Sequence, residues 1–324
     1  MSFGSLLDSF ASLRALVVGD LMLDEYIHGR ATRISPEAPV MVIRQQSTSS
    51  VPGGAANVAQ NIRALGAEAR TVGVVGADAA GDALEAALRL SGELGLVRDP
   101  IRATTRKTRV LADHAHQVLR IDHEGEEPVS AEIEQKLIDS ALSHFDGCQV
   151  LVLSDYLKGA LTERVAQTLI SCANGSGVPV VANPKPRSLE QYRGATLVSL
   201  NRAEASEVVG RHAEILNEDA LAVAKDIRDR FGVGAVLVTL GEGGMAVAGD
   251  SSFLVSAPRV EVYDTAGAGD TVIATVALGL GSGSGVTQPV FELAAQTSAS
   301  VVRKVGVATP QPEDLAAIRG ELLP

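Results

Sequence analysis

The stretch Asp264–Thr271, with the sequence Asp-Thr-Ala-Gly-Ala-Gly-Asp-Thr, stands directly before an apolar run that begins at Val272. The run predicts a helix, and small residues at its start leave the N–H groups of the first turn accessible. These N–H groups and the helix dipole favour a bound anion. We therefore predict an anion hole for phosphoryl transfer and a catalytic base, Asp270, that accepts the proton of an acceptor hydroxyl. The predicted hole consists of Gly267, Ala268 and Gly269. The alternative is an ordinary helix start, where the dipole favours an aspartate.

Around this stretch, short apolar runs alternate with helical patterns over most of the chain. Residues 14–19 read as a buried strand, and a helical pattern at 162–173 leads to an apolar run at 178–182. The chain has no Trp and only 3% aromatic residues, so its core must consist of Val, Leu, Ile and Ala. This composition is typical of parallel strands covered by helices on both faces. We predict an α/β fold with three layers, α/β/α, around a mostly parallel sheet, in a single domain over residues 1–324.

Two segments, at about 24–50 and 104–123, interrupt this alternation. The second is predicted to be a hairpin with its turn near Asp113 and His114, and the first to be an antiparallel excursion with a strand at 40–45. We expect the two segments to form one small sheet that covers the substrate as a lid and forms a homodimer contact, because exposed sheet edges favour pairing. The hairpin carries Arg106, Lys107, Arg109 and Arg120. Lys107, Arg109 and Arg120 are predicted to bind a phosphate group of the substrate; the alternative is a solvated strand face.

Polar residues follow several predicted strands at the edge where α/β sheets bind ligands. Asp20 follows the first strand and Asp155 follows the apolar run at 150–153, so both are predicted to bind substrate. A carboxylate accepts hydrogen bonds from sugar hydroxyls, and the amide of Asn57 can both donate and accept. At Gly53 and Gly54 the backbone can approach the substrate closely, so both are also predicted contacts. Thr239, Gly241 and Gly244 follow another strand and are predicted to form part of a nucleotide site.

These motifs together resemble the ribokinase-like, or PfkB, family of carbohydrate kinases. The stretch 264–271 resembles one family signature and Gly53-Gly-Ala-Ala-Asn-Val-Ala59 the other, in the family's order and within a similarity that runs over nearly the whole chain. Asn201-Arg-Ala-Glu204 resembles the family's Asn-x-x-Glu motif for the Mg²⁺-nucleotide. The resemblance implies the ribokinase-like fold, ATP as phosphoryl donor, and Mg²⁺ held by Asn201 and Glu204, in part through water. It also implies a monovalent cation, such as K⁺, at Asp264 and the carbonyl of Ala266. Lys158 and Lys185 are candidates for contact with phosphate, Lys185 at the nucleotide, and the alternative is that either is a surface lysine.

One branch of the family, the D-glycero-β-D-manno-heptose 7-phosphate kinases, is more similar still. The most specific segment is Arg33-Ile-Ser-Pro-Glu-Ala-Pro-Val40, supported by Leu153-Ser-Asp-Tyr-Leu-Lys-Gly159. The resemblance implies phosphorylation at O1, a step toward ADP-heptose and lipopolysaccharide. The chain departs from the branch at Asn183, where an Asp is usual, so any role of an Asp there is in doubt. The alternatives are another sugar or sugar-phosphate kinase of the family, and a non-catalytic sugar-phosphate sensor, which would need neither Asp270 nor the glycines.

Composition and other motifs argue against several classes of protein. The formal net charge is -11 and no long basic run occurs, which argues against a nucleic-acid partner. The uncharged run at 271–291 contains a Gly-Ser tract and is too short in its apolar part for a bilayer span. The start of the chain lacks a secretion signal and its two cysteines suit a reducing compartment, so we expect a cytoplasmic protein. The chain has no Walker A motif, Gly241–Ala246 lacks the context of a dinucleotide site, and His114 with His116 is a poor metal site.

Overall fold

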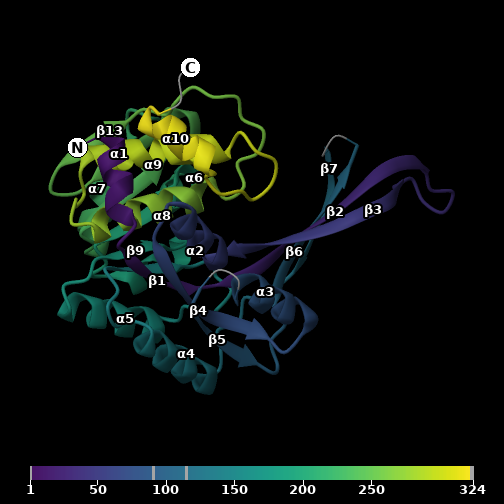
Figure 1. Cartoon of the computed structure of the whole chain (residues 1–324), viewed down its shortest axis with the longest axis horizontal. Coiled ribbons are helices and arrows are strands. Elements are labelled where there is room, and N and C mark those ends of the chain that lie inside the picture. The colour runs from purple at the N-terminus through teal and green to yellow at the C-terminus, as the bar shows by residue number, and fades with distance from the viewer. Residues whose placement is uncertain (1, 90–91, 114–115, 322–324) are drawn as a thin grey trace.

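The larger sheet forms the centre of the molecule in a computed structural model that describes residues 2–89, 92–113 and 116–321 (Figure 1). In this part of the chain it has nine strands, in the order β13-β12-β11-β10-β9-β8-β1-β4-β5. The strands from β11 to β5 are parallel, and β12 and β13 are antiparallel to their neighbours. Their bounds are β1 Arg14–Gly19, β4 Glu68–Gly76, β5 Leu94–Asp99, β8 Val150–Ser154, β9 Val180–Asn183, β10 Leu197–Asn201, β11 Ala235–Thr239, β12 Met245–Ala248 and β13 Ser252–Val255.

Helices cover both faces of this sheet, and each face has its own apolar core. In β1, Ala15 and Val17 pack into one core while Leu16 and Val18 pack into the other, as the alternation of side chains along a strand requires. The first core is covered by α1 Phe3–Phe10, α2 Ala55–Ala64, α3 Ala79–Arg89, α8 Ala268–Gly281, α9 Gln288–Val301 and α10 Pro312–Arg319. The second is covered by α4 Ala131–Ser143, α5 Glu163–Gly175, the 3₁₀ turn η1 Pro186–Tyr192, α6 Arg202–Val208 and α7 Ala220–Phe231. The predicted three-layer α/β fold is confirmed.

A second, four-stranded sheet projects from the body of the molecule, as Figure 1 shows for the long hairpin of β2 and β3. We call it the small sheet. Its order is β3-β2-β6-β7, with β2 and β6 parallel and both outer pairs antiparallel. The strands are β2 Leu21–Ile34, β3 Met41–Gly54, β6 Thr105–Ala112 and β7 His116–His123. The two interrupting segments therefore pair with each other, as expected. The division of the chain into one domain with an inserted lid stays a prediction.

Several elements differ from the sequence-based expectations. The strand expected at 40–45 is wrong in extent, because β3 has 14 residues and continues through the polar segment 45–50. That segment carries no apolar alternation, so only its pairing with β2 makes it a strand. Strand β5 and helices α1 and α10 were not predicted. The proposed turn residue His114 lies outside the described residues.

Two predictions from composition concern cysteines and membranes. Cys148 is buried and Cys172 is partly buried, and both are free thiols. Burial raises the pKa of Cys148 to about 11, so this thiol is inert at neutral pH. Within the described residues, the structure contains no helix with the length and apolar character needed to cross a membrane.

Candidate active site

Asp270 lies in the first turn of α8 and is held by two hydrogen bonds. Asn57 of α2 donates its amide Nδ2 to Asp270 Oδ2 at 2.6 Å, and the hydroxyl of Tyr156 donates to Asp270 Oδ1, also at 2.6 Å. Burial raises the pKa of Asp270 to about 6, although the two donors act in the opposite direction. A carboxylate with this pKa is ionised at neutral pH yet basic enough to accept a proton, as a general base requires.

Glycine at position 267 allows α2 and α8 to meet at this point. Gly267 caps α8 with a φ of 80°, a left-handed conformation that favours glycine, and a Cβ there would lie 2.9 Å from Asn57 Nδ2. Asn57 is in turn fixed by Asn61, whose Nδ2 donates to Asn57 Oδ1 at 3.2 Å. Thr271 donates its hydroxyl to Asn61 Oδ1 at 2.7 Å and closes the network. The two signature segments of the sequence are therefore in direct contact.

The start of α8 also borders a pocket of about 540 Å³. Ala268 and Gly269, predicted for the anion hole, line it from one side. The predicted nucleotide residues Thr239, Gly241 and Gly244 line it as well. Its remaining wall is largely apolar and includes Ala257, Pro258, Val260, Val262, Ala295, Ala299 and Val302. A largely apolar pocket that opens onto helix N–H groups suits a ligand with an aromatic base at one end and phosphates at the other.

Asn201 and Glu204 form a capping box at the start of α6. Asn201 Oδ1 accepts the N–H of Glu204 at 2.9 Å, and Glu204 Oε2 accepts the N–H of Asn201 at 2.8 Å. The other oxygen, Glu204 Oε1, accepts from Lys185 Nζ at 2.6 Å. Asn201 is paired in register with Thr239 of the pocket, so these residues lie beside it. Asn183, the departure from the heptose-kinase pattern, keeps its Oδ1 buried without a hydrogen-bond donor among the described residues.

Asp20 and Asp155 are as buried as Asn57, each 2% exposed, and protein donors already occupy them. Asp20 accepts three backbone N–H groups of the loop that follows β8: those of Tyr156, Lys158 and Ala160. Burial and the charge of Asp155 raise the pKa of Asp20 to about 6. In this structure Asp20 holds a loop through these bonds, and its Oδ1, which accepts the N–H of Ala160, keeps a further lone pair. Its predicted contact with sugar hydroxyls stays a prediction.

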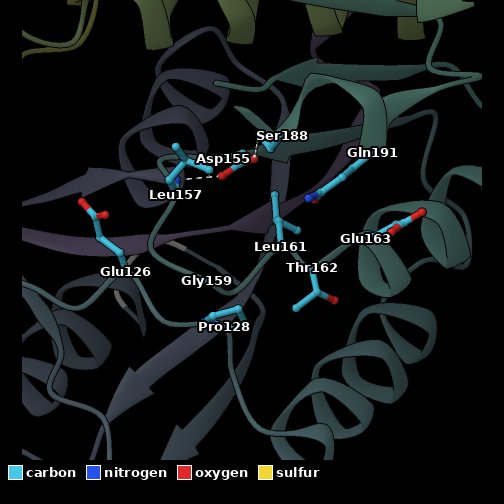
Figure 2. Close-up of a pocket in the computed structure, with 10 residues that line it drawn as sticks. All are labelled: Glu126, Pro128, Asp155, Leu157, Gly159, Leu161, Thr162, Glu163, Ser188 and Gln191. Carbon is cyan, nitrogen blue, oxygen red and sulfur yellow. Dashed lines mark hydrogen bonds between the residues drawn. The ribbon is translucent and has the colours of Figure 1, made fainter. Parts of the chain in front are cut away.

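Asp155 lines a different pocket, whose lining residues Figure 2 shows. Its volume is about 210 Å³. Asp155 Oδ1 accepts the N–H of Leu157 at 2.8 Å. Its Oδ2 accepts the hydroxyls of Ser188 at 2.6 Å and Tyr192 at 2.9 Å. Asp270 and the two residues that bond to it do not line this pocket. Asp155 thus lines a second pocket, although its chain neighbour Tyr156 contacts Asp270, and its role in substrate binding stays a prediction.

The lid cations gather on one face of the small sheet. Strand register pairs Asp24 with Lys107, Tyr26 with Arg109, and Arg109 with Arg120, and paired residues project to the same side. Asp24, which is 4% exposed, lies close enough to Asp270 that its charge raises the pKa of that residue. The face that carries the predicted phosphate-binding cations therefore adjoins the candidate base.

Each of these cations has a carboxylate partner in the structure. Arg109 forms an ion pair with Asp24, and its guanidinium stacks over the ring of Tyr26 at 5.6 Å from the centroid. Lys107 and Lys158 both approach Glu124, at 3.6 and 2.8 Å. Arg120, by contrast, pairs with Asp122 on the exposed outer strand β7. Lys107 and Lys158 are thus the cations that converge on one point.

Gly53 and Gly54 connect the small sheet to α2. A Cβ at Gly53 would lie 2.0 Å from Asp24 Oδ2, so any side chain would displace this carboxylate. Gly54 has a φ of 58°, and a Cβ there would lie 2.5 Å from the carbonyl oxygen of Asp20. In the structure this backbone approaches Asp24 and Asp20 closely, and its predicted contact with the sugar stays a prediction.

Asp264 fixes the loop that leads into α8. Its Oδ1 accepts the N–H of Ala266 and its Oδ2 accepts the N–H of Gly306, both at 2.9 Å. The adjacent N–H of Val307 donates to the hydroxyl of Tyr26 at 3.0 Å. The predicted cation site at Asp264 and Ala266 therefore lies where the small sheet, the end of α9 and the anion hole meet.

Two residues of this site were not predicted: Tyr156 and Asp24. Tyr156 stands within the segment 153–159 that resembles the heptose kinases, and Asp24 follows the first strand, four residues after Asp20. Their position in these segments was a usable signal. The missing information was which side chain faces Asp270, and this depends on how the loop after β8 folds back over β1.

Comparison with known proteins agrees with these features. The family model described as pfkB family carbohydrate kinase matches residues 13–314. The chain is 43% identical to the Bifunctional protein HldE of Bradyrhizobium sp. (strain ORS 278), over 99% of this chain and 66% of that protein. It is 42% identical to the Bifunctional protein HldE of Gluconobacter oxydans (strain 621H), over 96% of this chain and 65% of that protein. The chain spans just under two thirds of the length of these relatives.

Solved structures share the fold at lower identity. Phosphofructokinase-2 from Escherichia coli, in complex with potassium, has a TM-score of 0.81 and 22% identity, covering 96% of this chain and 99% of that one. Ribokinase from Thermotoga maritima has a TM-score of 0.71 and 19% identity, covering 94% and 98%. Fold, family match and sequence relatives agree, and the chain belongs to the pfkB family of carbohydrate kinases.

Proposed function

We propose that this carbohydrate kinase transfers the γ-phosphoryl group of ATP to O1 of D-glycero-β-D-manno-heptose 7-phosphate, which yields the 1,7-bisphosphate for the ADP-heptose and lipopolysaccharide pathway. The observation that carries the proposal is the surroundings of Asp270. A pocket of nucleotide character adjoins it at the start of α8, and a sheet face with Lys107 and Arg109 adjoins it through Asp24. The resemblance of segments 33–40 and 153–159 to the heptose 7-phosphate kinases supports this acceptor. The proposed location is the cytoplasm, where ATP is available.

In the proposed reaction, Asp270 accepts the proton of the O1 hydroxyl while O1 attacks the γ-phosphorus. The bond from the γ-phosphorus to the bridging oxygen breaks, and ADP leaves. The N–H groups of residues 267–269 stabilise the charge on the transferring group. Lys107 and Lys158 hold the 7-phosphate by displacing Glu124, whose carboxylate both lysines approach. This assignment adds Lys158 to the predicted lid cations and gives Arg120 an outer position.

The oxygen atoms at two places in the site suit a bound cation. Asn201 Oδ1 and Glu204 Oε2 each accept one N–H and keep a further lone pair, so they suit Mg²⁺ held through water, the ion that would neutralise charge on the ATP phosphates. The oxygens of Asp264 likewise each accept one N–H, so with the carbonyl of Ala266 they suit K⁺.

The acceptor is tested by a coupled ADP-release assay across a panel: heptose 7-phosphate, heptose, fructose 6-phosphate and ribose. We expect the highest kcat/KM for heptose 7-phosphate. A higher value for fructose 6-phosphate or for a neutral sugar would assign a different kinase activity. Binding of heptose 7-phosphate with no ADP release from any acceptor would favour the sensor alternative.

Asn201→Ala is expected to raise the Mg²⁺ concentration that gives half-maximal activity, with little change in the sugar KM. Glu204→Ala should act in the same direction. Titration of Mg²⁺ at saturating sugar measures the effect. Because both substitutions break the α6 capping box, which is worth about 1 kcal/mol, a matched control is needed. Ser130→Ala removes the N-cap of α4, and should cost similar stability without changing the Mg²⁺ dependence. Loss of sugar affinity alone in Asn201→Ala would contradict the nucleotide assignment.

The small sheet is proposed to form a homodimer contact. Its exposed apolar side chains include Leu119 and Ile121 of the outer strand β7, each 52% exposed. Ile121→Glu should therefore shift the protein from dimer to monomer in light scattering at micromolar concentration. Ile101→Glu is the control, because Ile101 is 94% exposed but lies outside the small sheet. A strictly monomeric wild-type protein would refute this proposal only.

A further inference from the structure

Tyr156 links the candidate base to the loop that follows β8. Its hydroxyl donates to Asp270 Oδ1 at 2.6 Å, and Asp270 Oδ2 accepts from Asn57 at the same distance. Two donors on different oxygens fix both the rotation and the plane of the carboxylate. Burial, and then the charge of Asp270, raise the pKa of Tyr156 well above its usual value of 10, so the phenol stays protonated and can only donate to an ionised Asp270.

The loop that carries Tyr156 is held independently of the phenol. Asp20 accepts the N–H of Tyr156 at 2.8 Å and that of Lys158 at 2.9 Å. Between them, Leu157 has a φ of 54°, a left-handed conformation that is unusual for a residue with a side chain. Asp155 holds Leu157 from the other side through its N–H. Two buried carboxylates thus maintain a strained loop, and the consequence of its shape is that Tyr156 reaches Asp270.

Lys185 contacts the same ring from the nucleotide side. Its Nζ lies 5.1 Å from the centroid of Tyr156 and 2.6 Å from Glu204 Oε1. A cation over a phenol ring withdraws electron density and strengthens the hydroxyl as a donor. A continuous series of contacts therefore runs from Glu204 through Lys185 and Tyr156 to Asp270, and joins the proposed Mg²⁺-nucleotide residues to the proposed base.

We propose that Tyr156 is a positioning residue: its hydroxyl aligns the carboxylate of Asp270 for proton abstraction and favours the ionised form. The inference rests on the proposed role of Asp270 as the base, and the segment 153–159 that contains Tyr156 was not given a role in the reaction. The other titratable groups that act on Asp270 are Asp24 of β2, whose charge raises its pKa, and Lys185, whose charge lowers it. Removal of the Tyr156 hydroxyl removes a donor to the charged form, so the pKa of Asp270 must rise.

The test is Tyr156→Phe, with kcat/KM measured from pH 5 to 9 on the best acceptor of the panel. A base must be deprotonated to act, so the wild-type rate should fall below about pH 6. In Tyr156→Phe we expect this acidic limb to move up by about 1 pH unit, because a hydrogen bond to a charged group has that order of effect. The sugar and ATP KM values should change less than about threefold, and most of the rate should return at high pH.

Tyr192→Phe is the matched control. This substitution also removes a tyrosine hydroxyl. Tyr192 is fully buried, and its hydroxyl donates to Asp155 instead of Asp270. Tyr192→Phe should lower thermal stability and leave the acidic limb in place. An equal shift in Tyr192→Phe would assign the effect to the loop and overturn the inference, as would an unchanged limb in Tyr156→Phe. The phenol takes no part in the N–H bonds to Asp20, so the isosteric variant should fold, which thermal unfolding checks.

Failure of this inference can be told apart from failure of the proposed function. If Asp270→Asn remains active, the base assignment fails and Tyr156 loses its proposed role. If Asp270→Asn is inactive and Tyr156→Phe keeps the wild-type profile, only the inference about Tyr156 fails. Carboxyl ¹³C NMR of Asp-labelled protein needs no acceptor. The Asp270 resonance is identified as the one that is missing from the spectrum of Asp270→Asn. It should titrate at higher pH in Tyr156→Phe than in the wild type, and an identical titration would overturn the inference.

Discussion

Asp270→Asn is expected to lower kcat by about 10²–10⁴-fold, the usual contribution of a general base. The side chain keeps its size and can still accept the hydrogen bond of Tyr156, but it no longer accepts the proton of the sugar hydroxyl. Affinities for ATP and sugar should change little, because the nucleotide pocket and the small sheet do not depend on this charge. Steady-state kinetics and calorimetric titration of both ligands measure the two effects separately.

Asp99→Asn is the control for this substitution. Asp99 is also a buried aspartate, 7% exposed, and accepts the backbone N–H groups of Ile101 and Arg102 in the loop after β5, rather than bonds from Asn57 or Tyr156. It should keep kcat near the wild-type value even if it lowers stability. If Asp270→Asn retained more than about a tenth of the wild-type kcat, the assignment of the base would be wrong.

Lys107→Ala is expected to raise KM for heptose 7-phosphate roughly 10- to 100-fold and to change KM for ATP little. Hydrogen bonds to charged groups are worth about 1.5–3 kcal/mol, and tenfold in affinity is about 1.4 kcal/mol. The protein's net charge of -11 repels anions, so a sugar phosphate depends on such local donors. Steady-state kinetics with both substrates varied will show whether the loss is confined to the sugar.

Arg109→Ala should also raise the sugar KM, but we expect it to lower kcat and stability as well. Its removal leaves Asp24 buried without its cation, next to Asp270. Arg106→Ala is the matched control for both variants, because Arg106 neighbours Lys107 on β6 and projects to the opposite face. An unchanged sugar KM in Lys107→Ala, or an equal loss for ATP, would move the phosphate site elsewhere, with Lys185 the next candidate.

Local sequence was sufficient to predict those parts of the site that lie on a single helix or directly after a single strand. The start of α8 was predicted because small residues before an apolar run identify a helix that exposes its N–H groups, and Asp270 follows from that position. Thr239, Gly241 and Gly244 follow a strand, and the structure gathers them with Gly269 in one pocket. The order of strands and helices also follows from periodicity, because buried strands and amphipathic helices have different repeats.

The fold class, the family and the helix start that carries Asp270 follow from the sequence alone. Which polar groups already have partners becomes visible only in the folded protein. Asp20 and Asp155 are at the predicted sheet edge, yet backbone N–H groups and buried hydroxyls satisfy them, while Tyr156 reaches the base. Lys107 and Lys158 likewise converge on Glu124 from separate segments. The reason is physical: periodicity is a local property of the chain, whereas a buried polar group takes whichever partner the packing of distant segments brings within hydrogen-bonding distance.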